Sequence, residues 1–182
     1  MRKLTASFFM SLDGVVDTPQ AWHFPYMDQQ LVEAVGATMA ASDTILLGRT
    51  TFEEWASYWP EQAGDGGMAD FINNTPKYVV SQTLESVAWR NSTVIRDDVL
   101  ATVAGLKQEH GREISVTGSG TLVRSLLVAG LVDELRLMVH PVVVGRGKHL
   151  FENGDEPTGL ALASCERFAN GVLNLTYKVD AR

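Results

Sequence analysis

The sequence predicts an α/β domain in which helices cover both faces of a mainly parallel sheet. Two observations carry this prediction. Short apolar runs typical of strands alternate with segments of helical spacing, and the last two apolar segments follow each other with no helix between them. Alternation of strands and helices favours parallel pairing through crossovers, and consecutive strands favour antiparallel pairing. The 182 residues suit one domain, 1–182, whose core needs no disulfide.

In the first half of the chain, strands and helices are expected to alternate. Apolar and polar side chains alternate over 4–10, which predicts a strand that ends at the turn-forming pair Asp13 and Gly14. Apolar residues at helical spacing follow Asp28, a good N-cap residue, and predict a helix over 28–41. The other elements expected in this half are a strand at 44–48, a helix at 51–59, and strands at 77–81 and 92–96.

The second half is expected to continue this alternation and then to end in strands alone. Its elements, in chain order, are a helix at 98–110, a strand at 114–116, a helix at 121–130, a strand that starts near Asp133, and two consecutive strands at 160–167 and 172–179. The last two strands would supply the antiparallel part of the sheet.

The charge balance argues against a polyanion as partner. Lys and Arg number 15 against 22 Asp and Glu, for a net charge of −7, and no stretch concentrates basic residues as a nucleic-acid interface requires. No run of the sequence approaches the roughly 18 apolar residues of a membrane span. We therefore expect no nucleic-acid partner and no membrane association. Binding of one small anionic ligand is compatible with this net charge, because it depends on only a few positioned hydrogen-bond donors.

Cysteine and histidine usage excludes two kinds of site. The single cysteine, Cys165, excludes an internal disulfide and a Cys-rich zinc site, which fits a cytoplasmic location. The polar residues Thr5, Ser7 and Asp13 interrupt the apolar N-terminal stretch, so we expect no signal peptide. The four histidines lack the spacing of metal ligands, and we expect no metal site.

The stretch "ISVTGSGTLVRSLLVAG", 114–130, leads from an apolar strand through two glycines that flank Ser119 into a helical pattern. Glycines let the backbone approach a phosphate, and a helix start offers unpaired N–H groups beside the hydroxyls of Ser119 and Thr121. The Rossmann fingerprint is absent, because Val123 stands where its third glycine belongs. The residues alone fit either a phosphate cradle or a strand-to-helix turn capped by Ser119 or Thr121.

A second junction of this kind is "LLGRTTFEEW", 46–55, which places Arg49, Thr50 and Thr51 directly after a glycine. Arginine offers a planar fork for phosphate, and the threonines can cap the helix or donate to a ligand. The alternative is an exposed arginine beside an ordinary threonine cap. Two such junctions suit a ligand with several phosphates that lies across the carboxyl ends of the strands.

Six motifs along the chain resemble the dihydrofolate reductase-like superfamily, and most closely its branch related to the reductase domain of riboflavin biosynthesis. They are "SLDG", "LLGRTTFE", "KYVVSQTL", "VTGSGTLVRSLL", "LVDELRL" and "VVVGRGKHLF", in order over about residues 3–180. The resemblance implies a three-layer α/β/α fold and NADPH as hydride donor. It also implies a homodimer, because related reductases often pair through their last strands.

The resemblance further implies which residues bind the cofactor. Three groups of residues would contact the cofactor. The 2′-phosphate and pyrophosphate side would be held by Gly48, Arg49, Thr50 and Thr51. The adenosine part would lie near Ser81 and Gln82, and the pyrophosphate would be cradled by Gly118, Ser119, Gly120, Thr121 and Leu122.

Two residues are candidates for contact with the substrate. The family places Asp13 where nicotinamide and substrate meet, and a carboxyl group there can supply or relay a proton or orient the substrate. The pair of Asp13 and Gly14 is also good turn chemistry. Trp22 lies in an expected loop, where its aromatic face suits stacking on a planar ring, although a core position is the alternative.

The expected activity is that of an NADPH-dependent reductase acting on a small planar heterocycle, pyrimidinone-like or pterin-like, or on a related carbonyl compound. True dihydrofolate reductases carry a pterin-binding acid on the helix after the first strand. Here Asp28 is expected as a cap and Glu33 lies in no pterin-binding context, so folate is not the expected substrate. The rival hypothesis is a non-catalytic binding or interaction protein that retains the fold.

Overall fold

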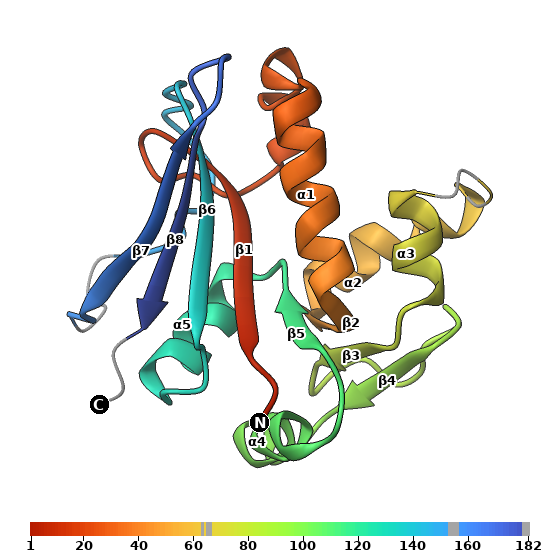
Figure 1. Cartoon of the computed structure of the whole chain (residues 1–182). Helices are drawn as coiled ribbons and strands as arrows, with labels where there is room; N and C mark the ends of the chain where they lie inside the picture. The colour runs from red at the N-terminus through yellow and green to blue at the C-terminus, as the bar shows by residue number, and fades with distance from the viewer. Residues whose placement is uncertain (63, 65–66, 153–156, 180–182) are drawn as a thin grey trace.

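The computed structural model describes residues 1–62, 64, 67–152 and 157–179. Within them the chain forms an eight-stranded sheet in the order β4-β3-β2-β5-β1-β6-β8-β7, as Figure 1 shows. The strands are β1 (Leu4–Ser11), β2 (Ser42–Gly48), β3 (Lys77–Val80), β4 (Ser92–Ile95), β5 (Glu113–Val116), β6 (Glu134–His140), β7 (Leu160–Arg167) and β8 (Leu173–Val179). Strands β1 to β6 are parallel, and β8 and β7 join antiparallel. The predicted α/β fold is confirmed.

Helices lie on both faces of this sheet (Figure 1). They are α1 (Gln29–Ala41), α2 (Arg49–Ala56), α3 (Met68–Asn74), α4 (Val99–Gln108) and α5 (Gly120–Val128), with short 3-10 turns η1 (Pro19–Ala21), η2 (Phe24–Tyr26) and η3 (Trp59–Glu61). Helices α4 and α5 pack on one face, and α1, α2 and α3 pack on the other. Asp28 is the N-cap of α1, because its Oδ1 accepts from the N–H of Leu31 at 2.9 Å.

Some boundaries differ from the sequence-based expectation. The helix expected at 51–59 begins at Arg49 and ends at Ala56, and of its last expected residues only Trp59 belongs to the turn η3. Pro60, which stands inside that turn, cannot continue an α-helix. Helix α3 was not expected, because seven residues show too little periodicity to be separated from a loop.

The main core lies between the sheet and the helices α4 and α5. Alternate residues of the central strands point into it, and the amphipathic face of α5 packs on them. The fully buried members include Leu4, Ala6, Ile114, Val116, Val123 and Leu126. On the opposite face, a second cluster under α2 and α3 contains Ile45, Leu47, Phe52 and Ile72. The packing of α5 against β5 fixes the turn between them.

Candidate active site

Two strand-to-helix turns meet at the carboxyl edge of the sheet. Strand β2 pairs with β5, and the N–H of Gly48 at the end of β2 donates to the carbonyl oxygen of Gly118 at 3.1 Å. A Cβ added at Gly48 would lie 2.7 Å from the Ser119 Oγ. A Cβ added at Gly118, whose φ is +156°, would lie 2.6 Å from the Thr51 Oγ1. Both glycines are therefore required for the close approach of the two turns.

The first turn of α5 offers unpaired N–H groups. The Ser119 Oγ accepts from the N–H of Leu122 at 3.4 Å, so Ser119 is the N-cap, as one of the two interpretations of this motif expects. The peptide bond between Gly118 and Ser119 is cis. The N–H groups of Gly120 and Thr121 lie in the first turn, where no carbonyl of the helix can reach them. The cap leaves other N–H groups of this turn available, because the Ser119 Oγ accepts from only one of them.

A groove of about 390 Å³ opens beside these turns. The lining combines residues from both turns with mostly apolar side chains from β3, α4 and α5, namely Gly48, Arg49, Ser119, Thr121, Leu122, Val80, Val99, Leu100, Ser125 and Leu126. Of the cofactor residues predicted from the sequence, Gly48, Arg49, Ser119, Thr121 and Leu122 line this groove. The other lining residues were not singled out, because single residues in separate elements carry no motif.

Arg49 and Ser81 lie near this edge of the sheet and differ in the hydrogen bonds that their side chains make. The Arg49 side chain is half exposed on α2, and its Nη1 lies 2.8 Å from the Glu53 Oε2. An exposed ion pair of this kind contributes little to stability, so a ligand can replace Glu53 as the partner of Arg49. The Ser81 Oγ accepts from the N–H groups of Thr83 at 3.2 Å and Leu84 at 3.0 Å, so this hydroxyl closes a turn after β3, and Gln82 beside it is exposed.

Asp13 anchors a neighbouring loop. Its carboxylate accepts from the Ser11 hydroxyl at 2.6 Å and from the N–H groups of Val144 at 3.1 Å and Gly145 at 2.7 Å. The Ser11 bond, followed by the two backbone bonds, lowers the pKa of Asp13 to about 2. A carboxyl group with this pKa is ionised at neutral pH and is no proton donor in this state. Of the roles open for Asp13, the geometry favours orientation and turn formation.

Comparison with known proteins decides the family. The RibD C-terminal domain model matches residues 2–174. The chain belongs to the RibD C-terminal domain family. It is 33% identical over 138 residues to the uncharacterized protein YyaP of Bacillus subtilis (strain 168), covering 74% of this chain and 73% of YyaP.

The chain is similar in fold to solved structures of a putative riboflavin biosynthesis protein and of a dihydrofolate reductase. A putative riboflavin biosynthesis protein from Shewanella sp. PV-4 superposes with a TM-score of 0.77 at 20% identity, over 98% of this chain and 99% of that one. Dihydrofolate reductase from Enterococcus faecalis, complexed with NADP(H), superposes with a TM-score of 0.63 at 17% identity, over 98% and 96%. These likenesses establish a dihydrofolate reductase-like fold for the chain.

Trp22 packs inside the domain, in a cluster of rings at the ends of β1 and β6. Its ring lies edge-on to His140 with centroids 5.3 Å apart, its Nε1 donates to the Asp17 carbonyl at 3.2 Å, and only 9% of it is exposed. Phe9 and Tyr26 also contact the His140 ring. This geometry favours the core interpretation of Trp22 over stacking on a substrate.

His140 is the buried centre of this ring cluster and was not singled out from the sequence. It is fully buried, its Nδ1 lies 2.8 Å from the Met138 carbonyl oxygen, and burial lowers its pKa. His23 is buried beside it and stacks on Phe9, and its pKa is also lowered by burial. Both rings are therefore neutral at physiological pH. His140 stands within an apolar run of the sequence, and no motif there marks it as a buried centre.

Other kinds of site have no geometric support in the part of the chain that the structure describes. There, no three His, Cys, Asp or Glu side chains are grouped as metal ligands would be. Over the same residues, no helix is both long enough and apolar enough to cross a bilayer. A further depression of about 590 Å³, lined by Phe52 and Trp89 among others, lies apart from the glycine turns.

The state of Asp13 leads to a pH prediction. Because its folded-state pKa of about 2 lies below the ordinary value of 3.8, its bonds stabilise the loop at pH above about 4 and are lost as the pH falls through 2. Replacing Asp13 with alanine should accelerate hydrogen exchange at Val144 and Gly145 at least about tenfold at neutral pH. Asp97→Ala, at an exposed position, is the control. A carboxyl titration of Asp13 by NMR with a midpoint near 4 would contradict this account.

Proposed function

We propose that this protein is an NADPH-dependent reductase that transfers hydride to a small planar heterocycle or a related carbonyl compound. One observation carries the proposal. The glycine turns after β2 and β5 touch through the bond from Gly48 to Gly118, and they border one groove with apolar walls. Two helix starts and a groove of this kind suit a ligand that combines phosphates with a planar base.

The residues present fit a dinucleotide. A side chain at Gly48 or Gly118 would fill the space where the turns approach, and backbone N–H groups at the start of α5 suit a pyrophosphate. Arg49 would hold the 2′-phosphate after exchanging its exposed bond to Glu53. The apolar walls at Val80, Val99 and Leu100 would receive the adenine, with Ser81 and Gln82 nearby. The similar dihydrofolate reductase fold that is complexed with NADP(H) supports this choice.

The bound cofactor would supply the hydride, and the chain would supply position and shelter. The groove walls would fix the cofactor, and the loop held by Asp13 would border the reacting atoms and exclude water. Because Asp13 is ionised, it would orient this loop and the substrate without donating the proton. Thr50, Thr51 and Thr121 would support the two phosphate-binding turns.

The homodimer implied by the resemblance stays a prediction. Strand β7 is the edge of the sheet, and most of its side chains are exposed, including Leu162 at 56%. A long exposed edge strand can pair with another chain, which supports an interface at this edge.

Arg49→Ala tests the cofactor assignment. The variant should weaken NADPH binding by roughly tenfold to a hundredfold, the range expected for a lost charged hydrogen bond, and should leave NADH binding nearly unchanged. Tryptophan fluorescence titration measures both affinities. Glu53→Gln is the matched control, because it removes the partner of Arg49 and keeps the arginine, so NADPH binding should persist. Equal losses for NADPH and NADH in Arg49→Ala would disprove the role of Arg49.

A further inference from the structure

A second pocket lies apart from the cofactor groove, between α2, α3 and the segment that joins β3 to β4. Its volume is about 590 Å³, within the range of roughly 300–1,000 Å³ that is usual for small-molecule sites. Phe52 and Ala56 come from α2, Asn73 comes from α3, and Trp89 and Arg90 come from the joining segment. None of the described residues that line this pocket also lines the groove beside the glycine turns. A ligand bound here would therefore leave the cofactor groove open.

Hydrogen bonds hold the inner wall of this pocket in place. The Trp89 Nε1 donates to the Asn73 Oδ1 at 2.9 Å, and the Asn73 Nδ2 donates to the Trp59 carbonyl oxygen at 2.8 Å. The Phe52 ring lies against Trp89, with ring centroids 5.7 Å apart. Because the polar atoms of Asn73 and Trp89 are already paired, this wall offers a ligand mainly aromatic and apolar contact. The wall is formed in the absence of a ligand.

The charge beside this wall is positive. Arg90 is exposed at the rim, and its guanidinium makes no hydrogen bond or ion pair with any residue that the structure describes. The Lys77 Nζ lies 4.5 Å from the centre of the Trp89 ring. Burial, and then the charge of Arg90, lower the pKa of Lys77 to about 8, so the two cations lie close enough to repel each other. The described lining residues include no Asp or Glu that could match this charge.

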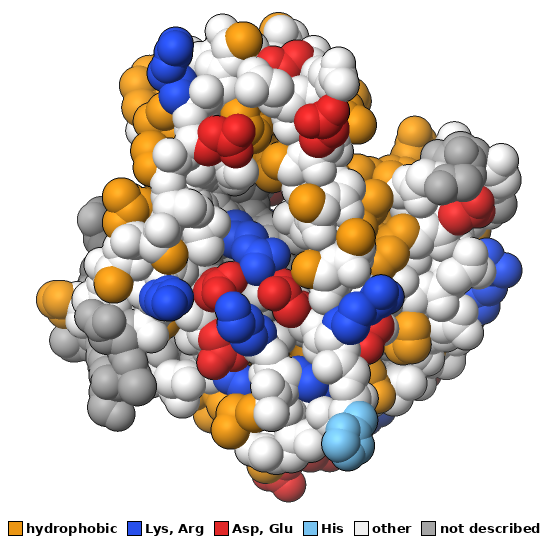
Figure 2. Space-filling model, viewed as in Figure 1, with side chains coloured by type: hydrophobic (Ala, Val, Ile, Leu, Met, Phe, Trp, Pro, Cys, Tyr) orange, Lys and Arg blue, Asp and Glu red, His pale blue; other side chains and the backbone are white. Residues whose placement is uncertain are grey.

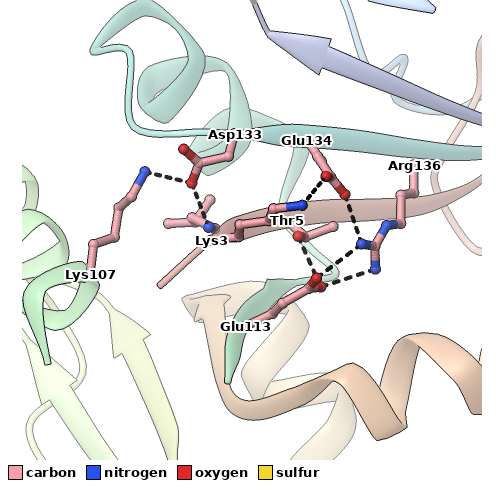
Figure 3. Close-up of polar contacts among 8 residues, drawn as sticks. Lys3, Thr5, Lys107, Glu113, Asp133, Glu134 and Arg136 are labelled. Atoms are coloured by element: carbon pink, nitrogen blue, oxygen red, sulfur yellow. Dashed lines mark hydrogen bonds and ion pairs between the residues drawn. The ribbon is translucent and has the colours of Figure 1, made fainter. Parts of the chain in front are cut away.

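Other cations of the chain are matched by carboxylates. Figure 2 shows basic and acidic side chains next to one another on one face of the molecule. Figure 3 shows a group of this kind, in which the Arg136 guanidinium lies 3.0 Å from Glu113 and 2.7 Å from Glu134. Arg90 differs from Arg136 because its hydrogen-bond donors stay available beside an aromatic wall. An anionic group of a ligand can use these donors.

We propose that the pocket lined by Phe52, Trp89 and Arg90 binds a planar aromatic carboxylate. The ring of the ligand packs against Phe52 and Trp89, and its carboxylate accepts two hydrogen bonds from the Arg90 guanidinium. The planar fork of arginine matches the two oxygens of a carboxylate, and contact between aromatic rings adds to the gain from apolar burial. This site is separate from the reductase site, and the inference does not depend on the proposed function.

Binding of 2-naphthoate tests this site, with 2-naphthamide as the uncharged probe that has the same ring. Titrations followed by heteronuclear NMR monitor the indole N–H of Trp89. The affinity for 2-naphthoate should exceed that for 2-naphthamide at least about tenfold, because only the carboxylate carries a charge for Arg90. Arg90→Gln should remove this difference and keep the binding of 2-naphthamide. Arg167→Gln, at an exposed position of β7, is the matched control and should bind both probes as the wild type does.

The outcomes separate the role of Arg90 from unspecific binding of an aromatic ring. A preference for 2-naphthoate that Arg90→Gln abolishes and Arg167→Gln keeps supports the inference. Three results overturn it: no saturable change of the Trp89 signal up to about 1 mM 2-naphthoate, equal affinities of the two probes, or a preference that persists in Arg90→Gln. The titration is repeated with saturating NADP⁺. An unchanged affinity for 2-naphthoate supports a separate site, and competition between the two ligands overturns it.

Discussion

Replacing Gly118 with alanine is expected to weaken NADPH binding at least about a hundredfold, or about 3 kcal/mol. The added Cβ would lie 2.6 Å from the Thr51 Oγ1 and 3.2 Å from the Thr51 Cβ. Because Thr51 is β-branched and close to its own backbone, rotation cannot clear this contact. The turns after β2 and β5 must therefore separate, which moves the start of α5 away from the phosphates. Calorimetry with NADPH measures the loss.

Gly105→Ala is the matched control for this variant. Gly105 lies within α4, and a Cβ there would have nothing within 4 Å. Alanine favours helix by up to about 1 kcal/mol over glycine, so this variant should be at least as stable as the wild type and bind NADPH normally. Wild-type affinity in Gly118→Ala would show that the contact between the two turns does not shape the cofactor site.

Replacing Lys77 with methionine is expected to lower the free energy of unfolding by about 3 kcal/mol. Lys77 is 1% exposed, and its Nζ donates to the carbonyl oxygens of Ile72 at 2.8 Å and Thr75 at 2.9 Å. It also lies 4.5 Å from the centre of the Trp89 ring. Burial lowers the pKa of Lys77 to about 8, so the ammonium form persists at neutral pH. Methionine fills a similar volume and leaves the carbonyl groups at the end of α3 without this donor.

Urea unfolding measures this effect, with Lys178→Met at an exposed position of β8 as control. The control should change stability by no more than about 0.5 kcal/mol. Because Lys77 lies under α3 and away from the glycine turns, the folded variant should keep its NADPH affinity. A change below 1 kcal/mol in Lys77→Met would indicate that water replaces the lost donor.

The sequence predicts elements best where a pattern is local. The apolar runs and helical spacing placed the strands and most helices within a few residues, and the order of the two last strands indicated antiparallel pairing. Helix α3 was missed because seven residues contain only two turns. The segment around Trp22 was expected to be a loop, and it contains the turns η1 and η2, whose Pro19 and Pro25 favour 3-10 geometry locally.

The candidate site was predictable where glycine and hydroxyl residues lie close in sequence. The turns at Gly48 and Gly118 could be recognised in this way, but their mutual contact depends on the pairing of β2 with β5. The role of Asp13 could not be decided, because its loop partner Gly145 is 132 residues away. Alternation over 4–10 predicted β1 and its two faces, but which of these faces lies under α1 depends on the packing of that helix.

Direct titration of the wild-type protein with NADPH, and separately with NADH, tests the central claim most directly. The chain has four tryptophans, and quenching of their fluorescence reports binding. The account predicts saturable binding of NADPH and at least tenfold weaker binding of NADH, because only NADPH carries the 2′-phosphate that Arg49 would hold. Absence of binding by both cofactors would contradict the reductase function and would favour a binding protein that retains the fold.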